Sequence, residues 1–94
     1  MKYYVEVKIP LNYLPYPGVF EFSQQIQIWL GIDATSAGAG FGYRDLEFSC
    51  MDEASALDLQ TKIRSLLETK VGNRSSDPPN VYAGILVEIR SYRG

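Results

Sequence analysis

Two acidic residues, Asp45 and Glu47, come closest in type and spacing to catalytic chemistry. They stand two positions apart in an alternating segment, so an extended strand places both carboxylates on one face, about 7 Å apart. Paired carboxylates at a similar separation serve as acid and base in glycosidases. The same spacing is common on solvated strands, where carboxylates pair with cations such as Lys8 or Arg90. We therefore expect ion pairing, and not catalysis, from these two residues.

Other catalytic groups are scarce, because the chain has no histidine and a single cysteine, Cys50. Without histidine it lacks the commonest general base and the commonest metal ligand. One cysteine can form neither an intrachain disulfide nor a cysteine-rich metal site. The strand pattern directs Cys50 into the core, where a thiol is inert. The sequence thus predicts no catalytic residue, no metal and no cofactor, and argues against a hydrolase, a zinc site or a catalytic triad.

A proline-rich segment, residues 10–18, carries polar and aromatic side chains that could contact a ligand. Prolines cannot continue a strand ladder, so this stretch is predicted to be a rigid loop at one end of a sheet. Loops in that position are usual places for ligand or protein contacts, which makes Asn12, Tyr13 and Tyr16 candidate contact residues. The alternative is that the tyrosines only cap the core over the following helix.

The hydrophobic pattern predicts the elements that position these side chains. Residues 2–9 alternate between apolar and polar side chains, which indicates a half-buried strand. Residues 17–30 gather apolar side chains on one helical face, with a proline in the first turn and Gly31 as a stop signal. The alternation in FEF and IQIW leaves a strand as the alternative for residues 19–30.

The remainder of the chain predicts a hairpin, a helix and a last strand. The hairpin has an edge strand in IDATS, a turn at residues 37–40 and a second strand over residues 42–51. A helix with an apolar stripe follows, capped by Asp52. The last strand spans residues 81–92, after a polar loop.

The predicted order of strand, helix, strand, strand, helix, strand resembles the ferredoxin-like βαββαβ plait. The resemblance implies one α+β domain over residues 1–94, with a four-stranded antiparallel sheet and both helices on one face. The other face of the sheet would then stay uncovered. Side-chain parity assigns to this open face the candidate partner-binding residues Tyr4, Glu6, Phe41, Tyr43, Leu86, Arg90 and Tyr92.

The run AGFGYRDL, residues 39–46, resembles in part the octapeptide with which the RNA recognition motif stacks bases on a plait of this kind. The likeness covers Gly40–Tyr43 and lacks the leading basic residue of the family. It implies a stacking surface made of Phe41, Tyr43 and, from the first strand, Tyr4.

Charge disfavours the partners that such a surface would serve. The formal net charge is −2, so the chain as a whole does not attract nucleic acid or an anionic membrane. The apolar runs are too short to cross a bilayer, and the first ten residues alternate instead of forming the core of a signal peptide. A cytoplasmic location without membrane contact is therefore expected.

The sequence favours a small non-catalytic binding or assembly protein that forms a homodimer, or binds another protein, through its open face. A chain of this length buries only about 60–65% of the surface that it exposes when unfolded, so a second copy would add stability. Two alternatives stay open. One is a weak single-stranded nucleic-acid binder that uses the sheet aromatics; the other is a cofactor-free enzyme with a pocket of Tyr13, Tyr16 and carboxylates.

Overall fold

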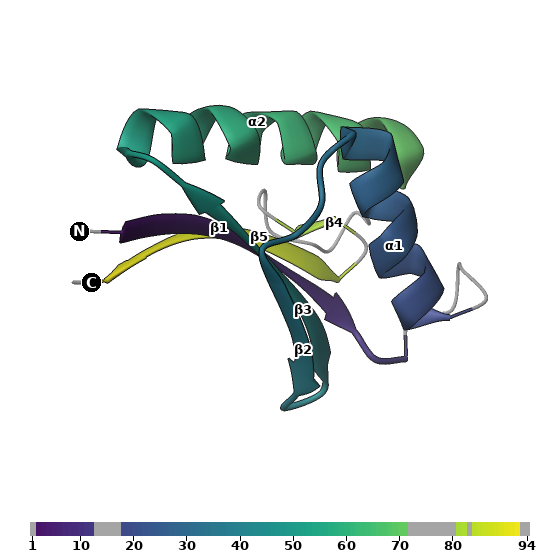
Figure 1. Ribbon diagram of the computed structural model, residues 1–94. Coiled ribbons are helices and arrows are strands. Elements are labelled where there is room, and N and C mark those ends of the chain that lie inside the picture. The colour runs from purple at the N-terminus through teal and green to yellow at the C-terminus, as the bar shows by residue number, and fades with distance from the viewer. Residues whose placement is uncertain (1, 13–17, 72–80, 83, 93–94) are drawn as a thin grey trace.

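The computed structural model describes residues 2–12, 18–71, 81–82 and 84–92, and every structural statement below concerns these parts of the chain. They form an α+β domain, as the sequence predicts, with one antiparallel sheet of strand order β2-β3-β1-β5-β4. Figure 1 shows both helices on the same side of that sheet. The elements are β1 (Lys2–Pro10), α1 (Val19–Leu30), β2 (Ser36–Gly40), β3 (Tyr43–Cys50), α2 (Glu53–Lys70), β4 (Val81–Tyr82) and β5 (Ile85–Tyr92).

The hydrophobic core lies between the sheet and the helices. β1 is the central strand, with β3 on one side and β5 on the other, and its side chains Val5, Val7 and Ile9 face the helices and are buried. Its two neighbours present apolar residues at the same levels, so one side of the sheet is continuous with the core. The remaining buried members are Val19, Phe22, Ile26, Leu46, Phe48, Ala56, Ile63, Leu67, Ile85 and Val87.

Residues 19–30 form a helix, so the strand alternative for this segment is wrong. The buried apolar side chains Val19, Phe22 and Ile26 recur every three or four residues, which is the spacing of one helical face. Gly31 ends the helix in the left-handed conformation, with φ 75°, and its N–H donates to the Gln27 carbonyl at 2.9 Å. Helical spacing prevails over the local alternation because it brings all three apolar side chains to the sheet together.

Helix α2 begins where the sequence predicts. The Asp52 carboxylate accepts a hydrogen bond from the Ser55 N–H at 2.7 Å, and this bond lowers the pKa of the carboxyl below its usual value. Ala56, Ile63 and Leu67 are buried and form the stripe with which the helix covers the sheet. Neither helix in the described part of the chain is both long and apolar enough to cross a membrane.

The glycine run forms a strand, and not a turn, which corrects the prediction for residues 37–40. β2 pairs with β3 from Ser36↔Glu47 to Gly40↔Tyr43 with an unbroken register. The chain reverses at Phe41 and Gly42, whose positive φ values of 51° and 84° are those of a two-residue type I′ hairpin turn. Of the two turn residues, only residue 42 is a glycine. Gly38 and Gly40, which lie within β2, do not have positive φ.

The C-terminal segment, predicted as one strand over residues 81–92, consists of two. β4 pairs with the start of β5 through Val81↔Leu86 and Tyr82↔Ile85. Gly84, which precedes β5, has φ 91°, a conformation open to glycine that lets the chain fold back within two residues. β5 then runs antiparallel to β1. The sheet therefore has four main strands, as expected, and in addition the two-residue edge strand β4. The edge strand predicted in IDATS, residues 32–36, lies instead at Ser36–Gly40.

Candidate functional site

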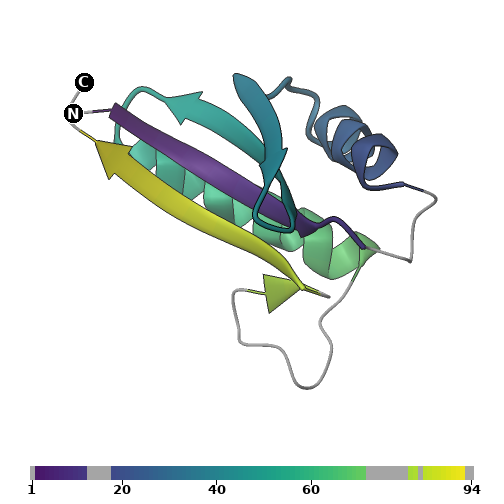
Figure 2. The same cartoon turned by 90° about the horizontal axis from the view of Figure 1, so that it is seen from below.

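The face of the sheet opposite the helices, called the open face below, carries the candidate site. Figure 2 shows this face in front of α2, with no helix lying across it. Strand register assigns its side chains and places Tyr4 and Tyr43 on it together, as parity predicts. Its described members are Lys2, Tyr4, Glu6, Lys8, Ser36, Gly38, Gly40, Tyr43, Asp45, Glu47, Ser49, Leu86, Glu88 and Arg90.

An ion-pair network centred on Glu6 occupies the middle of the open face. Arg90 Nε donates to Glu6 Oε1 at 2.8 Å, and Arg90 Nη2 donates to Glu88 Oε2 at 3.2 Å. Lys8 Nζ lies 3.7 Å from the same Glu6 oxygen. The Glu6 side chain is only 12% exposed, and its hydrogen bond and charge raise the pKa of the Arg90 guanidinium. Glu6 is therefore the shared partner of two cations, at the exposed surface of the sheet.

Aromatic and apolar side chains border this network. Tyr4 lies opposite Arg90 and is 9% exposed, although no helix covers it. Tyr43 is half-buried, and Lys8 Nζ stands 6.0 Å from the centre of its ring, within reach of a cation–π interaction. Leu86 is half-buried opposite Lys8. Apolar and charged atoms thus alternate across the surface.

Asp45 and Glu47 do not bind Lys8 or Arg90 as expected, because Glu6 holds both cations. Burial raises the pKa of the Asp45 carboxyl above its usual value, and the negative charge of Glu6 raises it further. Oδ1 of Asp45 is buried and has no hydrogen-bond partner among the described residues. A carboxylate in this setting carries an energetic cost that a donor or a proton would relieve.

Phe41 lies in the turn between β2 and β3, and not on the open face, which corrects its predicted position. Its side chain is completely exposed, at 105% of the reference area. The prediction extended the parity of the strand over residues 42–51 back to residue 41, whereas that residue lies in the two-residue turn and outside the ladder. The base-stacking surface implied by the resemblance to the RNA recognition motif therefore loses one of its three aromatics.

The remaining predicted contact residues are placed only in part. Asn12 is exposed in the turn that follows β1. Tyr13 and Tyr16 lie outside the described residues. Tyr92 ends β5 opposite Lys2, and its side chain also lies outside the described part of the structure.

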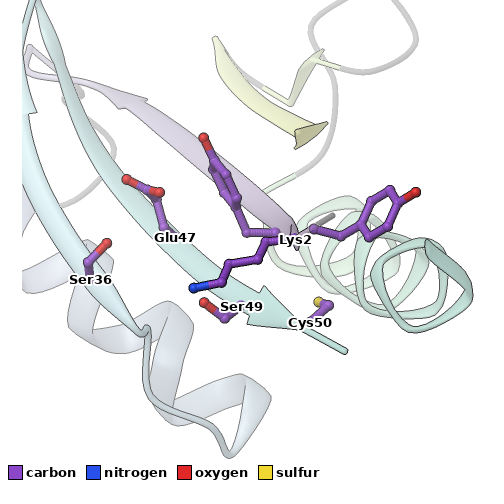
Figure 3. A pocket seen from close by; sticks show the side chains of 7 residues that line it. Lys2, Ser36, Glu47, Ser49 and Cys50 are labelled. Carbon is purple, nitrogen blue, oxygen red and sulfur yellow. The ribbon is translucent and has the colours of Figure 1, made fainter. Parts of the chain in front are cut away.

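A pocket of about 400 Å³ opens at the end of the sheet where β1 begins and β3 ends (Figure 3). In that view Ser36 and Glu47 lie on one side of it and Cys50 on the other. Its lining is Lys2, Tyr3, Tyr4, Ser36, Glu47, Ser49 and Cys50. Sequence reasoning missed this pocket because it draws side chains from both faces of the sheet. The register of β2 on β3, which brings Ser36 to Glu47, is the signal that could have indicated it.

The pocket offers the Lys2 ammonium, the Glu47 carboxylate and hydroxyl groups, but no activated nucleophile. Burial raises the pKa of the Cys50 thiol, and the charge of Asp52 raises it further, so the group stays protonated at neutral pH. Cys50 is half-buried against the edge of the core and not enclosed in it. The described residues contain no group of three or more side chains placed to hold a metal ion. This chemistry suits the binding of a small polar group.

The arrangement on the open face can hold a partner through mixed polar and aromatic contacts. Comparisons with family models, with curated proteins and with solved structures find no match for this chain, so the geometry described above carries the functional conclusion.

Proposed function

We propose that this is a small non-catalytic binding or assembly protein that associates with a second copy of itself through the open face. In the same proposal the fold is a ferredoxin-like plait to which the short strand β4 is added, and the protein works in the cytoplasm, where a lone cysteine stays reduced. The strand order β2-β3-β1-β5 and the two helices support the fold assignment.

The observation that carries the proposal is the ion-pair network at the centre of the open face. Glu6 holds Arg90 and Lys8 while tyrosines pack around them. Side chains that are already ordered lose little further entropy when a partner binds. Tyrosine and arginine are enriched at specific protein interfaces, and this face carries Tyr4, Tyr43 and Arg90.

A second copy is the partner that the face suits best. It carries both signs of charge, so it can be self-complementary, which a two-fold symmetric contact requires. A domain of this size also gains stability when more of its surface is covered. Nucleic acid is not favoured, because the carboxylates Glu6, Asp45, Glu47 and Glu88 outnumber the cations Lys2, Lys8 and Arg90 on the open face.

Light scattering coupled to size-exclusion chromatography tests the proposal. We expect a dimer at about 100 µM, a concentration that populates complexes of moderate affinity. Leu86→Lys places an extra cation beside Lys8 and should dissociate this dimer, whereas Leu57→Lys, the same change at an exposed leucine of α2, should not. A monomeric wild-type protein, or a dimer that Leu86→Lys leaves intact, would rule out association through the open face.

A further inference from the structure

Among the described residues, strand β2 forms one edge of the sheet and has strand partners on one side only. It pairs with β3 along its whole length, and it stands last in the strand order. An antiparallel edge strand directs the N–H and C=O groups of every second residue outward, where they can pair with another strand. All residues of β2 are exposed.

This edge lacks the features by which proteins usually prevent strand pairing. The sequence SAGAG has no charged residue and no proline, and its register on β3 is unbroken from Ser36 to Gly40. The opposite edge is formed by the two-residue β4 and, beyond it, by β5, which carries the charged residues Glu88 and Arg90. Of the two edges, β2 is therefore the one without charged residues, and it can accept a further strand.

The glycines of β2 have no role within a single copy. Gly38 and Gly40 have no positive φ, and a Cβ added at either would meet no atom within 4 Å. A glycine in a strand weakens it, and such glycines often mark places where another backbone approaches closely. An approaching backbone would account for two glycines that neither conformation nor space requires in a single copy.

Apolar surface lies beside the same edge. Phe20 and Ile28 of α1, two helical turns apart on one side of the helix, are 51% and 69% exposed. The Phe20 ring lies 4.7 Å from the guanidinium of Arg44, which stands on β3 opposite Ala39 of β2, so the Arg44 side chain connects this side of the helix to the hairpin. A shallow hollow of about 340 Å³, lined by Gln24, Gln27, Ile28 and Asp33, lies where the chain leaves α1 towards β2.

We propose that β2 pairs antiparallel with β2 of a second copy about a two-fold axis at Gly38, so that the two sheets become one. The strand is uncharged and small on both faces, hence compatible with itself. In this register Phe41 of the second copy lies level with Thr35, two residues along the chain from Asp33. The two-fold axis makes this contact the same in both copies. This β2–β2 interface, called the β2 joint below, is separate from the open-face interface, so a test of one does not decide the other.

Cross-linking tests the register directly. In a Cys50→Ser background, Gly38→Cys places two thiols opposite each other, with Cα atoms about 4.5–5.5 Å apart in an antiparallel pair, a span that a disulfide bridges. Gly40→Cys is the matched control, because its two copies lie four residues apart along the strands, about 13 Å. We expect a covalent dimer from Gly38→Cys alone on mild oxidation. No dimer from Gly38→Cys, or equal dimer from both variants, overturns the proposal.

A charge in the joint separates it from association through the open face. Ala39→Lys leaves the side chain exposed in a single copy but brings two cations together in the pair, and we expect dimerisation at least about tenfold weaker. Ala54→Lys, at an exposed alanine of α2, is the control. If Ala39→Lys dissociates the protein and Leu86→Lys does not, the β2 joint stands without the open-face contact. If only Leu86→Lys dissociates it, the β2 joint is wrong.

Discussion

Glycine-to-alanine substitution should change the free energy of unfolding with opposite signs at Gly38 and Gly42, which lie four residues apart in the same hairpin. At Gly38 the backbone is extended and a Cβ meets no atom, so alanine adds no strain and removes entropy from the unfolded chain. Glycine within a strand costs about 0.5–1 kcal/mol relative to alanine, and Gly38→Ala should recover that amount. At Gly42, φ is 84°, and alanine there should lose about 1–2 kcal/mol.

Urea denaturation followed by the fluorescence of Trp29 measures both effects. Trp29 is the only tryptophan in the chain. Its ring packs edge-on against Phe22 at a centroid distance of 6.2 Å and lies 5.4 Å from the Lys70 ammonium, so its environment changes on unfolding. For a domain of this size 1 kcal/mol corresponds to a shift of about 4–8 °C in Tm, which a thermal melt resolves. The measurement is repeated over a range of protein concentrations, because association adds stability that depends on concentration.

The reasoning is refuted if Gly38→Ala destabilises a single copy as much as Gly42→Ala does. Such a result would mean that the bare edge of β2 is required by the fold itself. A gain at Gly38 that is largest at low protein concentration and shrinks as concentration rises would instead show that alanine stabilises the chain and hinders the contact between copies.

Three further predictions concern the open face and the cap of α2. Asp45→Asn should raise the free energy of unfolding at neutral pH by up to about 1 kcal/mol, because it removes a carboxylate left without a hydrogen-bond partner at Oδ1. The pKa of Asp45 is raised in the folded protein, so the stability of the wild-type protein should fall as pH rises through that pKa. Denaturation is measured over a pH series. If Asp45→Asn shows the same fall, Asp45 is not its cause. A double-mutant cycle with Glu6→Gln and Arg90→Gln should give a coupling free energy of about 0.2–1 kcal/mol, which weakens in salt because Arg90 is 43% exposed. No coupling at low salt would show that the Glu6–Arg90 ion pair does not stabilise the fold. Asp52→Ala should destabilise the protein at neutral pH and much less in acid. A carboxyl whose pKa is lowered by folding contributes stability that is lost as pH falls through that pKa. An equal loss of Tm at both pH values would exclude the helix cap as the cause.

The covered side of the sheet could be predicted from side-chain alternation. Val5 and Val7 face the helices and Tyr4 faces away because a strand alternates at every residue, and this follows from the sequence of β1 alone. The helix over residues 19–30 was predictable for a similar reason, since Val19, Phe22 and Ile26 share a face only in a helix.

The glycine run could not be assigned in the same way. Glycine serves equally in turns that need positive φ and at edges that another chain approaches, and no side chain in SAGAG records which role applies. The turn at Phe41 could not be predicted from the sequence, because a phenylalanine rarely adopts a positive φ. The fold-back at Gly84 was missed because a glycine within an alternating run does not reveal its φ. The pocket near Cys50 depends on contacts between distant segments, which alternation within one segment does not contain.

The strand order means that the open face is complete only after β5 has paired with β1 during folding. β1 acquires its second neighbour only from β5, so Lys2 meets Tyr92, and Glu6 meets Arg90, across almost the whole chain. Contacts at such separation form late in folding, after a large loss of chain entropy. The β2–β3 hairpin, by contrast, closes through a turn of two residues and needs no distant segment. The hairpin that carries the unpaired edge of β2 can therefore form before the surface around Arg90 is complete.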